Sequence, residues 1–215
     1  MTELVFILDR SGSMSGLEGD TIGGFNSMIG KQKREPGECL VSTVLFDNFS
    51  QVIHDRVPLE RVPKLTEKEY FVRGCTALLD AVGGAVHHIG TIHKYARPED
   101  RPEKTMFVIT TDGLENASLR YDYSKVKHMI ERQKEEYGWE FIFLGANIDA
   151  AQEAARFGIG ADRAVRYQSD QEGTILNYEV ISEAVSSVRA CPSAPLAAGW
   201  KDRIEADFRK RGKKH

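Results

Sequence analysis

Residues 4–13 of this 215-residue chain read Leu-Val-Phe-Ile-Leu-Asp-Arg-Ser-Gly-Ser. The run over residues 4–8 is apolar without alternation, which is typical of a strand buried on both faces of a sheet. The charge of Asp9 ends this run, and no other run approaches the roughly 18 apolar residues that a membrane helix requires. The opening of the chain therefore predicts a central strand, and not a signal peptide or a membrane anchor.

Strand-like and helix-like patterns alternate along the rest of the chain. Short apolar or β-branched runs predict strands, and apolar residues three or four positions apart predict helices. The further predicted strands are residues 40–46, 51–57, 106–110, 141–144 and 164–167. The predicted helices have apolar stripes at 22/25/29, 78/82/85/89/92, 126/129/130 (continued by Gln133) and 178/181/185/188, with a short alanine-rich helix after residue 149.

Turn and cap signals join these elements. Asp47-Asn48 lies between two β-branched runs and predicts an antiparallel hairpin. Asp149 and Ser169 are predicted to cap the helices that follow them. Gly83-Gly84 inside a helix predicts a close approach to the sheet. The alternation as a whole predicts an α/β fold with three layers, in which a doubly wound, mostly parallel sheet carries one antiparallel edge strand.

Length and composition indicate one main domain of a soluble globular protein. The chain is 41% hydrophobic and 28% charged, which is ordinary for that class. Pro192 and Pro195 predict a linker, so we expect a domain over residues 1–190, followed by a linker and a short basic tail over residues 191–215. We expect the tail to be solvated and frayed. An acidic body with so short a basic segment does not indicate a nucleic-acid binder.

The cysteines indicate neither disulfides nor zinc. Cys39, Cys75 and Cys191 form no CxxC pair, so a disulfide framework or a zinc ribbon is not expected. Without an export signal, the reducing cytoplasm is the expected location.

Other polar features have structural interpretations. His87, His88 and His93 do not converge on one helical face and belong to no HExxH motif, so they predict no metal site. Met14 occupies the position that a nucleophile elbow would give to serine. The glycines near it lack a Walker lysine, which argues against a phosphate-binding loop.

Three polar clusters are predicted at the edge where the parallel strands end. Asp9, Ser11 and Ser13 follow the first strand, Thr76 precedes the longest apolar helix, and Asp112 follows the strand at 106–110. Ligand sites of open α/β sheets lie at this edge. All five side chains offer oxygen, which suits Mg²⁺, or Mn²⁺, better than zinc. The two carboxylates would balance the charge of the ion, and a coordination position would remain for an outside oxygen.

The same residues resemble the metal-ion-dependent adhesion site (MIDAS) of the von Willebrand factor A domain. The pattern of that site is D-x-S-x-S, then a distant T, then a distant D-G. In this chain the pattern reads Asp9-x-Ser11-x-Ser13, then Thr76, then Asp112-Gly113. The resemblance covers the alternating topology to about residue 190, and the form Asp-Arg-Ser-Gly-Ser-Met is similar to bacterial intracellular members of the family.

The resemblance implies a non-catalytic protein-binding module. Its ion would take an Asp or Glu carboxylate from a partner protein, with no role for nucleic acid or membrane. Ser11, Ser13 and Thr76 would coordinate through hydroxyls, and Asp9 and Asp112 largely through water. Asp80 and Gly113 would lie in the shell around these ligands, while Asn116 is expected to shape its loop. The three positive and three negative charges on the surrounding loops balance, so the ion itself would select a partner with a carboxylate. These charged residues are Arg10, Arg73, Arg120, Glu18, Asp20 and Glu115.

Two other functions fit parts of the sequence. A magnesium-dependent phosphohydrolase of the haloacid dehalogenase type also begins with an apolar strand that ends in aspartate. That family needs a second aspartate two positions later as the general acid, where this chain has Ser11. The other alternative is a metal-independent scaffold on the same fold, which EDTA would not affect.

Overall fold

The strands form a single six-stranded sheet. The computed structural model describes residues 1–212, and its strands are β1 (Thr2–Asp9), β2 (Cys39–Phe46), β3 (Ser50–Pro58), β4 (Lys104–Thr111), β5 (Glu140–Ala146) and β6 (Ala164–Tyr167). Their order is β3-β2-β1-β4-β5-β6. All neighbours are parallel except β2 and β3, which form the expected hairpin at the edge. The predicted α/β fold class is confirmed.

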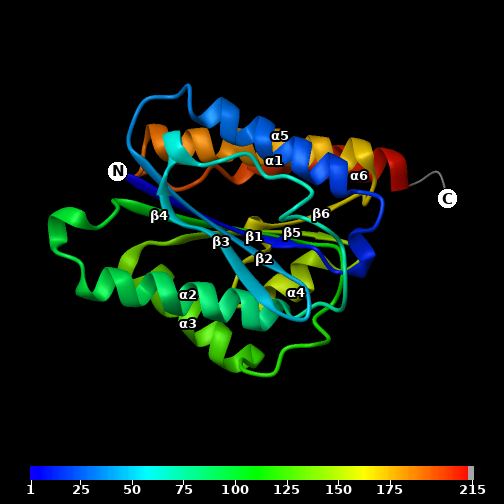
Figure 1. Cartoon of the computed structure of the whole chain (residues 1–215), viewed down its shortest axis with the longest axis horizontal. Helices are drawn as coiled ribbons and strands as arrows, with labels where there is room; N and C mark the ends of the chain where they lie inside the picture. Colours follow the sequence, from blue (N-terminus) through cyan, green and yellow to red (C-terminus); the bar gives the residue numbers. More distant parts are fainter. Residues whose placement is uncertain (213–215) are drawn as a thin grey trace.

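Helices cover both faces of the sheet (Figure 1). One face packs against α1 (Glu18–Gln32), α5 (Gln171–Ala190) and α6 (Asp202–Arg211), and the other against α2 (Leu78–Tyr95), α3 (Tyr123–Tyr137) and α4 (Ala150–Arg156). Within the described residues, none of these helices combines the length and the hydropathy needed to cross a bilayer.

The first strand lies at the centre of the molecule because both of its faces are apolar. Leu4, Phe6 and Leu8 contribute to the core under α1 and α5, while Val5 and Ile7 contribute to the core under α2 and α3. Every residue of β1 is buried. Burying each of these large side chains stabilises the fold by about 1.5–3 kcal/mol. The strand therefore gives the residues that follow it a rigid base.

Some local signals were predicted correctly and others were not. The Asp149 side chain caps α4, as expected. The cap of α5 is Asp170 and not Ser169, because the Asp170 carboxylate accepts a hydrogen bond from the Gly173 N–H in the first turn. The nearest neighbour of Gly83 is the ring of a loop residue and not the sheet. A Cβ at this position would lie 2.5 Å from the ring of Tyr121, so the glycine makes room for the loop that leads to α3.

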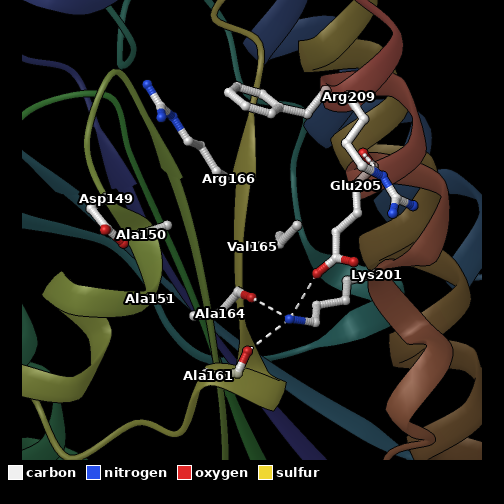
Figure 2. Close-up of a pocket in the computed structure, with 11 residues that line it drawn as sticks. Asp149, Ala150, Ala151, Ala161, Ala164, Val165, Arg166, Lys201, Glu205 and Arg209 are labelled. Atoms are coloured by element: carbon white, nitrogen blue, oxygen red, sulfur yellow. Dashed lines mark hydrogen bonds and ion pairs between the residues drawn. The ribbon is translucent and has the colours of Figure 1, made fainter. Parts of the chain in front are cut away.

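The C-terminal segment is folded, which differs from the frayed tail expected from its charge. A short helical turn (Ala198–Lys201) leads into α6, where Ile204 is 1% exposed in the core under α5. The Lys201 ammonium donates to the carbonyl oxygens of Ala161 at 2.7 Å and Ala164 at 2.9 Å, beside the edge strand β6 (Figure 2). The basic composition hid the apolar contact of Ile204, the one fully buried side chain of α6. The predicted tail residues Lys213 and Lys214 lie outside the described residues.

Replacing Ile204 with alanine is expected to lower the free energy of unfolding by about 2 kcal/mol, because the change leaves a cavity under α6. Arg209→Ala, on the exposed face of the same helix, is the matched control and should change stability by less than about 0.5 kcal/mol. Urea unfolding of both variants measures the difference. Equal stabilities would mean that α6 is not docked in solution.

Candidate metal site at the carboxyl edge of the sheet

The strand order reverses direction between β1 and β4. The chain moves outward from β1 through β2 on one side and returns to β4 on the other. The loops after these two strands therefore diverge at the carboxyl edge, which is where open α/β sheets bind ligands. Asp9 is the last residue of β1, and Asp112 directly follows β4. Ser11 and Ser13 lie in the short turn after β1, and Thr76 precedes α2.

Asp9 is held by the chain on every side. Its side chain is 2% exposed. One carboxylate oxygen accepts the Ser11 backbone N–H at 2.7 Å, and the other accepts the Thr111 hydroxyl at 2.6 Å. The Tyr70 hydroxyl donates to the Asp9 carbonyl at 2.5 Å. The carboxylate is therefore fixed in one orientation. Thr111 and Tyr70 were not predicted, although Thr111 stands immediately before Asp112.

The other four predicted residues meet beside Asp9. The Ser11 and Ser13 hydroxyl oxygens are 3.0 Å apart, and the Ser13 hydroxyl also donates to Asp112. A Cβ at Gly113 would lie 3.3 Å from the Thr76 hydroxyl and 3.4 Å from that of Ser13. Thr76 thus reaches the same point from a separate loop. The Thr76 and Ser13 hydroxyls therefore lie close to Gly113, where a side chain would crowd them. This is the supporting role that the sequence predicted for Gly113.

One oxygen of this cluster has no partner. Asp112 Oδ2 is buried and accepts no hydrogen bond. Burial, partly offset by the Ser13 hydrogen bond and reinforced by the charge of Asp9, raises the pKa of Asp112 to about 6. Burial also raises the pKa of Asp9, against the hydrogen bonds from Ser11 and Thr111. Two neighbouring buried carboxylates, one of them with an unsatisfied oxygen, are costly without a cation.

The donor set fits a hard divalent ion. Among the described residues no three or more His, Cys, Asp or Glu side chains group as a metal site, and the predicted site has only two carboxylates. Its remaining donors are hydroxyls, which Mg²⁺ and Mn²⁺ accept and zinc does not prefer. Asp9, Ser11, Ser13, Thr76 and Asp112 therefore form a group that fits Mg²⁺ in residue type, in charge and in its unpartnered oxygen.

The loop over residues 113–121 is tied to α2 by carboxylates. Asp80 accepts the backbone N–H groups of Leu119, Arg120 and Tyr121 at 2.9–3.0 Å. Its carboxylate therefore supports the loop and forms its hydrogen bonds there, not with the five site residues. Asn116 forms a reciprocal pair with Thr76: its side-chain oxygen accepts the Thr76 N–H at 2.9 Å, and its own N–H donates to the Thr76 carbonyl at 3.0 Å. The loop-shaping role expected of Asn116 thus includes holding Thr76.

Arg10 is not the surface charge that the sequence suggested. It is 1% exposed, and its guanidinium donates to Asp47 at 2.8 Å, to Gln51 at 2.9 Å and to the Glu69 carbonyl at 3.0 Å. Asp47 also accepts from Arg73 at 2.8 Å. This network ties the loop after β1 to the β2–β3 hairpin and to the segment before Thr76. Its only sequence signal is an arginine placed directly between a buried strand and the site.

A separate groove of about 360 Å³ lies beside β6, between α4 and α6. Figure 2 shows Arg166, Lys201 and Glu205 around it. None of the five site residues lines this groove, so it is distinct from the candidate metal site.

The comparisons with known proteins concern the fold. No protein-family model and no curated protein sequence matches the chain. Solved structures that are similar include a von Willebrand factor type A protein from Catenulispora acidiphila (TM-score 0.59, 13% identity, covering 86% of this chain and 42% of that one). Proximal thread matrix protein 1 of the mussel byssus, solved with zinc in its MIDAS motif, gives a TM-score of 0.58 at 13% identity, covering 86% and 46%.

A further similar structure is a D319A mutant of the PilB minor pilin from Streptococcus sanguinis (TM-score 0.59, 14% identity, covering 90% and 63%). The chain thus spans less than two thirds of the length of each of these proteins. At such identities the likeness establishes the architecture alone. With its six-stranded sheet in the order 3-2-1-4-5-6 and helices on both faces, the chain has a von Willebrand factor A-like fold.

Proposed function

We propose that the chain is a divalent-metal-dependent protein-binding module with a complete MIDAS. Ser11, Ser13 and Thr76 would hold Mg²⁺, or Mn²⁺, through hydroxyls, and Asp9 and Asp112 would balance its charge. The single observation that carries the proposal is the buried, unpartnered oxygen of Asp112 among three hydroxyls. The ion supplies a positive centre that attracts one further anionic oxygen.

The anionic oxygen is proposed to come from an Asp or Glu side chain of a partner protein. The protein's own donors are mainly neutral, so a bound divalent ion keeps attraction for a carboxylate. The similar fold of a minor pilin and of a zinc-loaded MIDAS protein supports a role in protein interaction. We further propose a bacterial cytoplasmic protein, in which Cys39, Cys75 and Cys191 stay as the free thiols seen here.

The proposal includes no catalytic step. Ser11 stands where a haloacid dehalogenase-type enzyme needs its second aspartate, and its hydroxyl is engaged with Ser13 at 3.0 Å. A serine hydroxyl is a far weaker acid than a carboxyl group, so it is poorly matched to the general-acid step of that reaction at neutral pH. Magnesium-dependent release of nitrophenol from a generic phosphate ester, abolished by Asp9→Asn, would establish the enzyme instead.

Metal-dependent capture of partners tests the proposal. The immobilised protein is incubated with extract of the source organism in Mg²⁺ and in EDTA, beside the variant Asp112→Asn. Proteins retained by the wild type in Mg²⁺ are expected to be lost in EDTA and with the variant. The matched control is Asp20→Asn, a partly exposed carboxylate in the first turn of α1, which should retain them. Binding that survives both EDTA and Asp112→Asn would establish the metal-independent scaffold.

A further inference from the structure

Large apolar side chains stand exposed on the loops around the candidate metal site. Phe49 is 74% exposed, Phe71 42%, Leu114 55% and Leu119 93%. We call these four residues the apolar rim. Exposed apolar side chains gathered around a polar site are typical of interaction surfaces in soluble proteins.

Backbone and side-chain contacts attach the rim to the site. Leu114 directly follows Gly113, around which the Ser13 and Thr76 hydroxyls close. Phe49 follows Asn48, whose side-chain oxygen accepts the N–H of Cys75 at 2.9 Å, one residue before Thr76. The rim is therefore a continuation of the metal site and not a separate patch.

The other two rim residues are also held in place. The N–H of Leu119 donates to Asp80 at 3.0 Å, in the first turn of α2. The ring of Phe71 lies 5.0 Å from the Arg73 guanidinium and 5.3 Å from that of Arg10. These contacts fix the loops before any partner binds, so little ordering cost remains for binding.

The charges on these loops favour an acidic partner. Their carboxylates are engaged within the protein: Glu115 accepts the N–H groups of Leu79, Ala117 and Ser118, and Asp47 accepts from Arg10 and Arg73. By contrast, Arg120 is exposed and forms no ion pair within residues 1–212, and Arg73 is 51% exposed. The exposed Arg120 therefore offers a cation beside the rim, while the half-exposed Arg73 is shared between Asp47 and solvent.

We infer that the partner segment is both acidic and apolar: one Asp or Glu reaches the ion, and large apolar side chains next to it in sequence pack on the rim. This inference rests on the proposed function, because the ion holds the carboxylate. The rim adds a selectivity for apolar side chains that the loop charges alone do not supply. Buried apolar anchors of this kind dominate binding energy at interfaces.

Selection from a phage-displayed library of random peptides tests the inference. Rounds against the wild-type protein in Mg²⁺, with elution by EDTA, are expected to enrich peptides in which Asp or Glu has Leu, Ile, Phe or Trp within two positions. The rim variant Phe49→Ser/Leu119→Ser should bind the selected peptides about 10-fold or more weakly. Both side chains are largely exposed, so the fold should tolerate the change.

The matched control changes two exposed aromatic residues at the opposite edge of the sheet. Tyr95 and Tyr137, at the C-termini of α2 and α3, are replaced by serine, and peptide affinity should not change. Magnesium-dependent peptides with acidic residues but no apolar neighbours, or unchanged affinity in the rim variant, would overturn the inference and leave the proposed function intact. Failure to enrich any peptide that EDTA elutes would count against both.

Discussion

Magnesium at about 100 times its dissociation constant is expected to raise the free energy of unfolding by about 2.7 kcal/mol. For a chain of 215 residues, this corresponds to a rise of about 5–11 °C in the melting midpoint. The reason is that the five donors come together only in the folded state, on loops that are far apart in sequence. Thermal unfolding followed by circular dichroism, in Mg²⁺ and in EDTA, measures the shift.

Asp112→Asn is expected to abolish this shift while leaving the protein in EDTA at least as stable as the wild type. In the wild type, Asp112 Oδ2 is buried without a partner, and the charge of Asp9 lies nearby. The amide removes one of two like charges and keeps an oxygen for the Ser13 hydroxyl. Asp20→Asn should keep the full magnesium shift. An unchanged shift in Asp112→Asn would place the ion elsewhere in the protein.

The position of the candidate site was predictable because parallel strands end at one edge. Asp9 and Asp112 follow two buried strands, so their meeting requires only the sheet. Thr76 was found by its place before an amphipathic helix. What holds these residues was not predictable, since Tyr70 and Asn116 act through tertiary contacts with no periodic signal. The hydroxyl of Tyr70 reaches across from a segment without regular structure.

The fold was predicted where hydrophobic periodicity is strong and missed where charge dominates. The apolar run at the start of the chain and the hairpin at Asp47-Asn48 follow from local pattern alone. The C-terminal helix α6 has a mostly charged sequence, and Ile204 alone is fully buried there. The composition of this segment predicts a solvated tail because its charges outnumber its apolar residues, and it gives no sign that Ile204 is buried. Arg10 shows the opposite error. Its charge predicted a surface position, but its place directly after β1 buries it in the interior.

Asp47→Ala is expected to destabilise the protein by about 3–5 kcal/mol, because it leaves the buried charge of Arg10 without compensation. Both side chains of this pair are 1% exposed, with the Arg10 Nε atom 2.8 Å from the Asp47 carboxylate. Asp55→Ala removes an exposed contact with the His88 ring at 2.9 Å and should cost less than about 1 kcal/mol. Urea unfolding at neutral pH compares the two. A similar small loss in both would mean that Arg10 finds water or another acceptor when Asp47 is gone.

The double variant Arg10→Met/Asp47→Ala separates a buried charge from a merely missing contact. It is expected to be more stable than Asp47→Ala alone, since removing both charges leaves none unpaired in the interior.

The stabilisation that Asp47 contributes depends on pH with a defined sign. Burial raises the pKa of Asp47, but hydrogen bonds from Arg73 and Phe49 and the charge of Arg10 lower it below 3.8 overall. Its stabilising contribution is therefore present above pH 3.8 and is lost as the pH falls through the lowered pKa. The difference between wild type and Asp47→Ala should accordingly shrink in acid, whereas a difference that persists there would point to lost packing and not to the ion pair.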